Sequence, residues 1–247
     1  MVKEEIEVQN IVENDVEKNS VEPVEEKKER EVVVPGEVIV SGDDFLPGDW
    51  TRREGKNIIA SRYGLAEKSG RLVKVIPLSG TYMPRPGNIV IGKVTDVTFN
   101  GWLMNIGAPY SAFLPVAECP RFISKDDLQE FIGIGDMVVA KVDAVKPKGV
   151  DLTIKIRGLG KQEDGMIIKI NPNKVPRIIG REGSMINLIK QETGCDVIVG
   201  QNGLIWIKGN TVLEELFAKE SITEITRQSF VPGLTERMTK WFKENKK

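Results

Sequence analysis

The sequence contains no histidine among its 247 residues. The chain therefore has no Ser–His or Cys–His catalytic pair, no imidazole general base and no histidine metal ligand. Its two cysteines, Cys119 and Cys195, lie far apart and match no zinc-ligand spacing. We expect two buried, reduced thiols in a cytoplasmic protein, and we predict no metal site and no cofactor.

Long apolar runs are missing as well. A membrane-spanning helix needs roughly 20 consecutive apolar residues, and no segment approaches that length although 40% of the residues are hydrophobic. The first residues are acidic and polar, so we expect no membrane contact and no secretory signal peptide.

Without histidine, an enzyme of this sequence would have to use carboxylates, as metal-dependent nucleases do. The acidic pairs to consider are Asp43–Asp44 and Asp126–Asp127. Both lie in contexts typical of a turn or a helix start, where aspartate is common for structural reasons. A magnesium-dependent carboxylate nuclease therefore stays open only as a less favoured alternative.

Charge is distributed unevenly. Residues 1–33 contain eleven acidic and five basic residues, a balance of −6. Because the whole chain carries −1, the remainder carries +5. A mildly basic body suits contact with nucleic acid, and we predict that residues 1–31 form an acidic, disordered tail.

Residues 32–82 predict a small all-β N-terminal domain. Short apolar runs rich in valine and isoleucine alternate with Pro-Gly and Ser-Gly turns, and no long helical period occurs. The predicted strands cover residues 32–34, 37–40, 57–61 and 72–77.

Residues 83–157 predict a second β domain. Five strands, with a helical or irregular interruption after the third, are typical of an OB-type barrel. The predicted strands cover residues 88–98, 102–106, 111–114, 137–145 and 150–156. A short linker is expected at residues 158–164.

The next region is organised around two glycines, Gly180 and Gly183, which bracket two polar residues. An apolar pair, Ile178 and Ile179, precedes them, and a segment with helical spacing of apolar residues follows. Glycine allows unusual backbone angles and close approach of a ligand, and the start of a helix attracts anions. We predict a strand over residues 165–170 and a short helix over 177–179 before the glycines. Two strands with a turn around residues 201–203 and helices over 211–228 and 233–244 complete the predicted order.

This pattern resembles the K-homology (KH) RNA-binding domain of type I, with a G-x-x-G loop and an extra C-terminal helix. We assign residues 165–231 to that α+β domain and residues 232–247 to the last helix. The resemblance implies that the loop clamps the sugar–phosphate backbone of single-stranded RNA. The implied KH contacts are Arg177, Ile178, Ile179, Gly180, Arg181, Glu182, Gly183 and Ser184.

The barrel segment resembles the S1 RNA-binding domain, in residues 87–94, 100–103 and 113–116. Such domains stack bases on exposed aromatic rings in a basic groove. The implied S1 contacts are Lys93, Phe99, Trp102, Phe113, Lys141, Lys146 and Lys148. Pro115 stands where many S1 domains carry a histidine, so one usual base contact is missing.

The order of β domain, S1 and KH resembles the RNA-binding cap subunits of the archaeal exosome, as do residues 82–92, 175–180 and 202–206. The resemblance implies a non-catalytic subunit with no small-molecule substrate, three copies of which sit on a hexameric ring of RNase PH-like subunits. The N-terminal domain would dock on that ring, which degrades RNA from 3′ to 5′ and adds tails. The alternative is a free-standing S1/KH translation or antitermination factor.

Overall fold

The computed structural model describes residues 30–124, 127–228 and 233–245. Apart from its last two residues, the predicted acidic tail lies outside these ranges. The chain divides into two compact units, residues 1–76 and 77–247, each of which is described by itself. Among the described residues, no helix has the length and apolar character needed to cross a bilayer.

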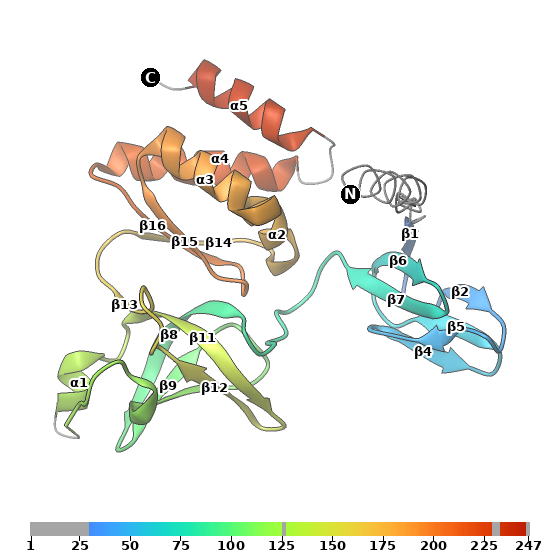
Figure 1. Ribbon diagram of the computed structural model, residues 1–247, viewed down its shortest axis with the longest axis horizontal. Helices are drawn as coiled ribbons and strands as arrows, with labels where there is room; N and C mark the ends of the chain where they lie inside the picture. The colour runs from blue at the N-terminus through green and yellow to red at the C-terminus, as the bar shows by residue number, and fades with distance from the viewer. Residues whose placement is uncertain (1–29, 125–126, 229–232, 246–247) are drawn as a thin grey trace, which may run out of the picture. The chain divides into compact units, whose positions relative to one another are not determined.

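The first unit is all-β over its described residues, as predicted (Figure 1). Two small sheets, ordered β1-β6-β7-β3 and β2-β5-β4, enclose a core of Val33, Ala60, Ala66 and Val75. Strands β3, β4 and β6 were not predicted. Strand β4 has the polar sequence Thr-Arg-Arg-Glu and is held by backbone pairing with β5, so it carries no apolar signal. The strands are β1 (Arg30–Val33), β2 (Val38–Ser41), β3 (Leu46–Pro47), β4 (Thr51–Glu54), β5 (Asn57–Ala60), β6 (Gly64–Ser69) and β7 (Leu72–Pro77).

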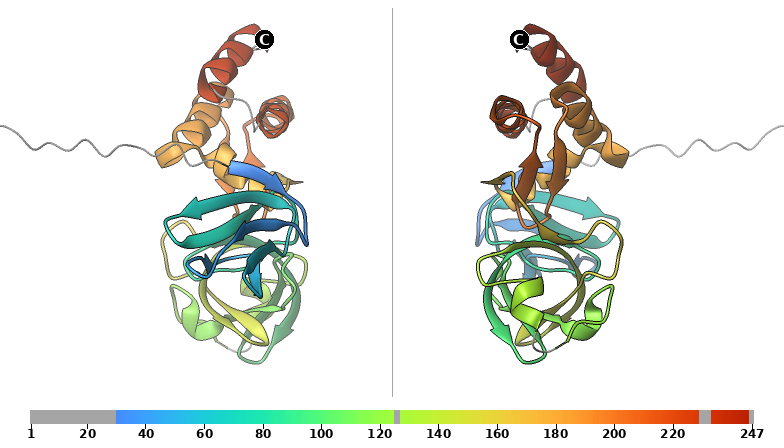
Figure 2. Two further views of the ribbon diagram at one scale, coloured as in Figure 1. Left: turned by 90° about the vertical axis from the view of Figure 1, so that its right-hand side faces the viewer. Right: turned by 90° about the vertical axis from the view of Figure 1, so that its left-hand side faces the viewer.

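The second unit begins with a closed five-stranded barrel, which confirms the OB-type prediction. Strand β8 pairs with β9, β9 with β10, β10 with β12, β12 with β11, and β11 again with β8. The parallel pairing of β10 with β12 closes the barrel, whose strands curve around one core in Figure 2. The strands are β8 (Ile89–Thr98), β9 (Gly101–Asn105), β10 (Ala112–Pro115), β11 (Met137–Lys146) and β12 (Gly149–Thr153).

The described part of the interruption after β10 contains the short helices η1 (Val116–Glu118) and α1 (Leu128–Phe131). Residues 158–164 were predicted as a linker, but they contain strand β13 (Gly160–Gln162), which pairs with β11. The sequence Gly-Lys-Gln has no strand signal because β13 is an edge strand that makes its contacts through the backbone. The barrel thus passes directly into the next domain.

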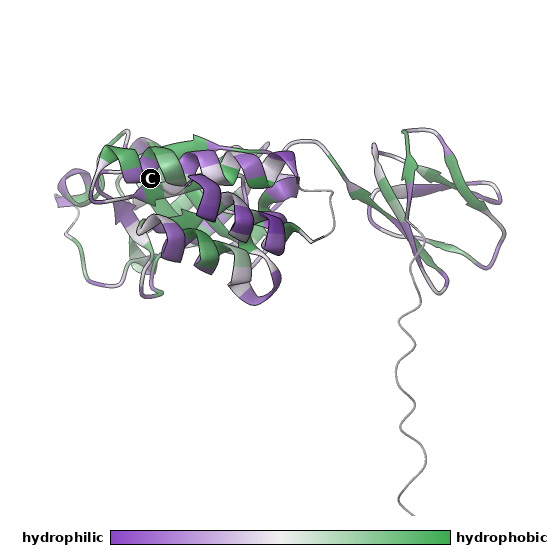
Figure 3. Ribbon diagram, turned by 90° about the horizontal axis from the view of Figure 1, so that it is seen from above, coloured by the Kyte–Doolittle hydropathy of each residue, from purple (hydrophilic) through white to green (hydrophobic). Residues whose placement is uncertain are grey.

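The KH region has the predicted strand–helix–loop–helix–strand–strand–helix order. Its antiparallel sheet is ordered β14-β16-β15; helices α2, α3 and α4 pack on one face, and α5 packs on α3 and α4 (Figure 1). In Figure 3, purple and green alternate along α4 and α5, as expected for helices with one buried side. The elements are β14 (Met166–Lys169), η3 (Pro172–Lys174), α2 (Val175–Ile179), η4 (Arg181–Gly183), α3 (Ser184–Thr193), β15 (Asp196–Val199), β16 (Leu204–Lys208), α4 (Val212–Arg227) and α5 (Leu234–Asn245).

The other face of the KH sheet contacts the barrel through an apolar cluster. Ile91 of β8, Val139 of β11 and Trp206 of β16 are buried together, and the Trp206 indole N–H donates to the carbonyl of Asp164 at 2.8 Å. The apolar contact removes one face of each domain from water, which favours a fixed arrangement of the two.

A polar turn between β15 and β16 completes this joint. The Asn202 side chain donates through Nδ2 to the carbonyls of Ile91 (2.7 Å) and Ile106 (2.9 Å), and its Oδ1 accepts the Ile91 N–H (3.3 Å). Gln201 makes two further bonds of 2.8 Å to the backbone of Ile89. The Asn202 side-chain amide thus provides hydrogen-bond partners for backbone groups of β8, as a neighbouring strand would.

Candidate nucleic-acid interface

The G-x-x-G loop connects α2 to α3 through three residues with positive φ angles. Gly180 has φ 74° and ψ 176°, Glu182 has φ 52° and ψ 28°, and Gly183 has φ 80° and ψ 10°. Glu182 and Gly183 both lie in the left-handed region, where only glycine is free of steric cost. The loop therefore turns the chain sharply and starts α3 without a side chain in front of it.

The two glycines have different structural roles. A Cβ at Gly180 would lie 2.7 Å from the Met185 backbone nitrogen and 2.9 Å from the Met185 Cβ, so this position is closed to other residues. A Cβ at Gly183 would meet nothing closer than 3.8 Å. Gly180 thus maintains packing, while Gly183 keeps the loop surface open to a ligand.

The start of α3 has no side-chain cap among the described residues, although the backbone N–H of Ser184 donates to the Arg181 carbonyl. The N–H groups of the first turn and the positive end of the helix dipole favour an anion there. Arg177, Arg181, Glu182 and Ser184 are exposed around the loop. A phosphate held here would contact backbone donors and two guanidinium groups, with the Glu182 carboxylate opposing it.

One predicted KH contact is wrong. Ile178 is fully buried in the core below the loop, packed with Val175, Met185 and Ile189, so it cannot contact RNA. Ile179 is half-buried at the edge of the same core. The apolar pair before the glycines therefore contains one core residue and one residue at the surface.

Trp102 is also wrongly predicted as a base-stacking residue. Its side chain is completely buried in the barrel, where the indole N–H donates to the Ile132 carbonyl at 2.8 Å and the ring contacts Phe131. Leu103, the next residue, points outward beside Phe113 on the neighbouring strand. The register of β9 therefore places leucine on the barrel surface and tryptophan in the core.

Two of the predicted rings, Phe99 and Phe113, face outward, and Tyr110 is also 40% exposed. Phe99, in the β8–β9 turn, is 77% exposed, and Phe113 is half-buried on β10 between Leu103 and Asp151. Of the predicted lysines, Lys146 forms an ion pair with Asp151 at 2.5 Å, while Lys148 is exposed in the adjoining turn. Lys141 is half-buried on β11, and Lys93 lies apart from these three, beside the KH domain.

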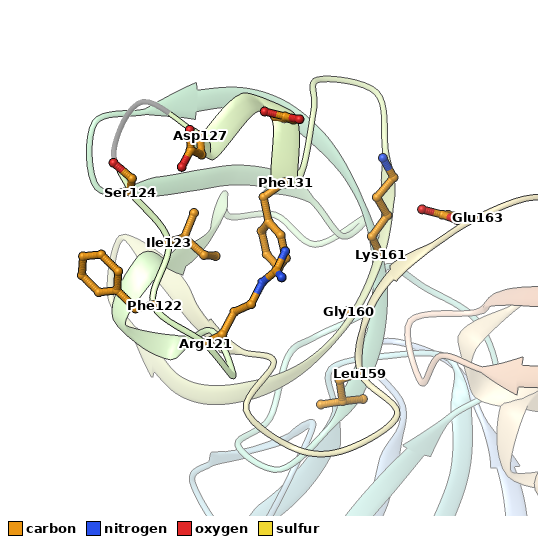
Figure 4. Close-up of a pocket in the computed structure, with 11 residues that line it drawn as sticks. Arg121, Phe122, Ile123, Ser124, Asp127, Phe131, Leu159, Gly160, Lys161 and Glu163 are labelled. Atoms are coloured by element: carbon orange, nitrogen blue, oxygen red, sulfur yellow. The ribbon is translucent and has the colours of Figure 1, made fainter.

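An aromatic residue near α1 was missed by the sequence analysis. Phe122 is 95% exposed at the edge of a cleft of about 760 Å³, in which the Arg121 guanidinium lies 5.0 Å from the centre of the Phe131 ring (Figure 4). The signal in the sequence is an adjacent Arg-Phe pair in a segment that was read as helical or irregular. Asp127, Glu130 and Glu163 also line this cleft, so it is a poor site for a phosphate.

The acidic pairs considered for a nuclease do not form a common site among the described residues. Asp43 and Asp44 are exposed in the first unit, where Asp43 lies 4.0 Å from the Lys56 ammonium group. Asp127 is exposed before α1, and Asp126 lies outside the described residues.

Comparisons with known proteins agree with this geometry. Residues 165–213 match the family model of the KH domain. The chain is 43% identical over 212 residues to the exosome complex component Rrp4 of Methanothermus fervidus, an alignment that covers 85% of this chain and 94% of that protein. It is 43% identical over 216 residues to Rrp4 of Pyrococcus horikoshii, covering 85% and 81%. A crystal structure assigned as an exosome complex RNA-binding protein matches with a TM-score of 0.60 and 34% identity, over 67% of this chain and 97% of that one.

Proposed function

Because this chain belongs to the Rrp4 family of exosome complex components, we propose that it is a non-catalytic RNA-binding subunit of an exosome. It captures single-stranded RNA and presents the strand to an RNase PH-like phosphorolytic ring, which degrades RNA from 3′ to 5′ and adds tails. The ring subunits break the phosphodiester bonds of the RNA, and this chain binds the RNA. The assembly acts in the cytoplasm, the compartment that suits two unpaired cysteines.

The observation that carries this proposal is the loop at Gly180–Gly183, in a domain whose sheet packs against the barrel. An uncapped helix start and an open glycine backbone bind a sugar–phosphate chain without regard to sequence. The exposed rings of the barrel offer stacking surfaces that also accept any base. Linked modules of this kind convert weak contacts into one tighter site, because the second contact forms at high effective concentration.

The first unit supplies the surface that docks on the ring. Large contiguous patches of exposed apolar side chains mark interaction surfaces in proteins. Apolar residues on its strands and turns are 36–56% exposed: Val32, Val34, Val38, Leu46, Tyr63, Leu72 and Ile76. We propose that this surface binds the ring subunits, with three copies of this chain on each hexamer.

RNA binding by the isolated full-length protein is the first test. Fluorescence anisotropy with a labelled single-stranded RNA should give an affinity that falls as salt rises, because phosphate contacts release counterions. A duplex DNA of equal length should bind much more weakly. The isolated protein with magnesium should leave the RNA intact, and cleavage would support the nuclease instead.

Assembly is the second test. Native mass measurement of a tagged copy purified from its own cells should find phosphorolytic ring subunits with three copies of this chain. Purification with ribosomes or RNA polymerase, and without ring subunits, would contradict the proposal in favour of the translation or antitermination factor.

A further inference from the structure

A second basic site lies where the barrel meets the KH domain. A cleft of about 580 Å³ is lined by Lys93 and Asn105 from the barrel and by Lys169 from the end of β14. Its lining includes no aspartate or glutamate. A concave surface with two positive charges and low-dielectric walls concentrates positive potential and attracts anions.

Neither lysine is neutralised by a neighbour. In the parts of the chain that the structure describes, no carboxylate forms an ion pair with Lys93 or Lys169, and both side chains are exposed. Other lysines of the same unit are paired, in Lys146–Asp151 (2.5 Å), Lys155–Glu118 (2.9 Å), Lys161–Asp136 (2.8 Å) and Lys208–Asp164 (3.4 Å). The cleft therefore combines two free ammonium groups that come from different domains.

The wall of the cleft adds no negative charge. Tyr82 lines it, and burial raises the pKa of its phenol to about 12, so the hydroxyl remains protonated at neutral pH. That hydroxyl donates to Asn88 Oδ1 at 2.8 Å. The Oδ1 atom of Asn105 accepts the Gly107 N–H at 2.9 Å, which leaves the Asn105 amide hydrogens as further donors toward an anion.

The spacing of the two lysines is set before any ligand binds. The Asn202 side chain and the apolar cluster around Ile91 and Trp206 hold the barrel strands against the KH sheet at this cleft. Because the frame is fixed, binding would order only the side-chain ends of Lys93 and Lys169, and the entropy cost is correspondingly small.

The cleft also lies on the face of the barrel that carries Phe113. Lys93 pairs with Asn105 across β8 and β9, and Leu103, two residues before Asn105, pairs with Phe113 on β10. Residues two apart on a strand share a face. A strand of RNA leaving the cleft can therefore cross the barrel surface toward the half-buried, outward-facing ring of Phe113.

We propose that this cleft binds a backbone phosphate of single-stranded RNA, so that the S1 and KH domains hold one continuous strand at their junction. This inference depends on the proposed RNA-binding function. It adds Lys169 to the proposed RNA-binding residues, as a second phosphate contact that comes from the other domain than Lys93.

Single neutral substitutions in the full-length protein test the site. We expect Lys93→Gln and Lys169→Gln each to reduce the slope of log affinity against log salt by about 0.7, the value for one phosphate contact on a single strand. At 0.15 M salt that slope corresponds to about a fourfold weaker Kd for each substitution. Lys219→Gln, an exposed lysine on α4 with no ion pair among the described residues, is the matched control and should leave both quantities unchanged.

The outcomes separate this inference from the proposed function. If the wild-type protein binds RNA but both cleft variants match Lys219→Gln, the cleft is not an RNA site and the proposed function stands. If the wild-type protein does not bind RNA, the proposed function itself fails.

A titration with inorganic phosphate at constant ionic strength distinguishes RNA from a free anion as the ligand. We expect millimolar phosphate to leave the difference in RNA affinity between wild type and the double variant Lys93→Gln/Lys169→Gln unchanged. Loss of that difference would identify a free-anion site and overturn the inference.

Discussion

Replacement of Asn202 by alanine should loosen the joint between the barrel and the KH domain. The substitution removes all three side-chain hydrogen bonds of Asn202 to Ile91 and Ile106, residues that are completely buried. A buried polar group left without a partner costs about 1–3 kcal/mol. With the lower value for each of three groups, the joint loses about 3 kcal/mol, which corresponds to a change of roughly a hundredfold in its opening equilibrium.

Native-state hydrogen exchange at the Ile91 amide measures this opening directly. In the wild-type protein that N–H donates to Asn202 Oδ1, and we expect its exchange to become at least about a hundredfold faster in Asn202→Ala. Asn210→Ala, at an exposed turn before α4, is the control and should leave the Ile91 amide protected. If Ile91 in Asn202→Ala stays within about threefold of wild type, the side-chain amide does not hold the joint, and the reasoning is refuted.

Three further predictions concern the loop, the barrel and the thiols. Gly183→Asp should weaken single-stranded RNA binding at least about tenfold, measured by anisotropy, because a carboxylate would face the phosphate. The control Gly194→Asp places an aspartate at a similar positive φ angle (φ +70°) at the far end of α3, and it should bind RNA normally. Phe99→Ala should weaken RNA binding by about 1–3 kcal/mol, the contribution of one stacked base, and should leave the melting temperature of the protein unchanged. An RNA affinity equal to that of the wild type would show that this exposed ring stacks on no base. Burial raises the pKa of the Cys119 thiol to about 11 and also raises the pKa of the Cys195 thiol. A thiol reagent at pH 7.4 should therefore label the native protein slowly and the guanidinium-unfolded protein at once. Rapid labelling of the native protein would contradict the burial of these thiols.

The sequence alone determined the parts of this protein that depend on local chemistry. Glycines at positions 180 and 183 define the loop between two helices, and Gly194 ends α3 in the left-handed conformation that favours glycine. Thr211 begins α4 with a capping box completed by Glu214. Such signals lie within a few residues of the structure that they specify, so they can be read without knowing the fold.

The tertiary structure alone decided which side chains reach the surface and which domains meet. Register shifts at residues 94–96 of β8 and 142–144 of β11 change which side chains of these two strands face the core. On β9, a register shifted by one residue would exchange the core tryptophan for the surface leucine. The turn at Asn202 predicts a hairpin from sequence, yet its side chain bonds to Ile91, 111 residues earlier in the chain. Lys93 and Lys169 line one cleft only because that contact brings two domains together. Contacts between residues so far apart in the chain depend on packing, which no local pattern encodes.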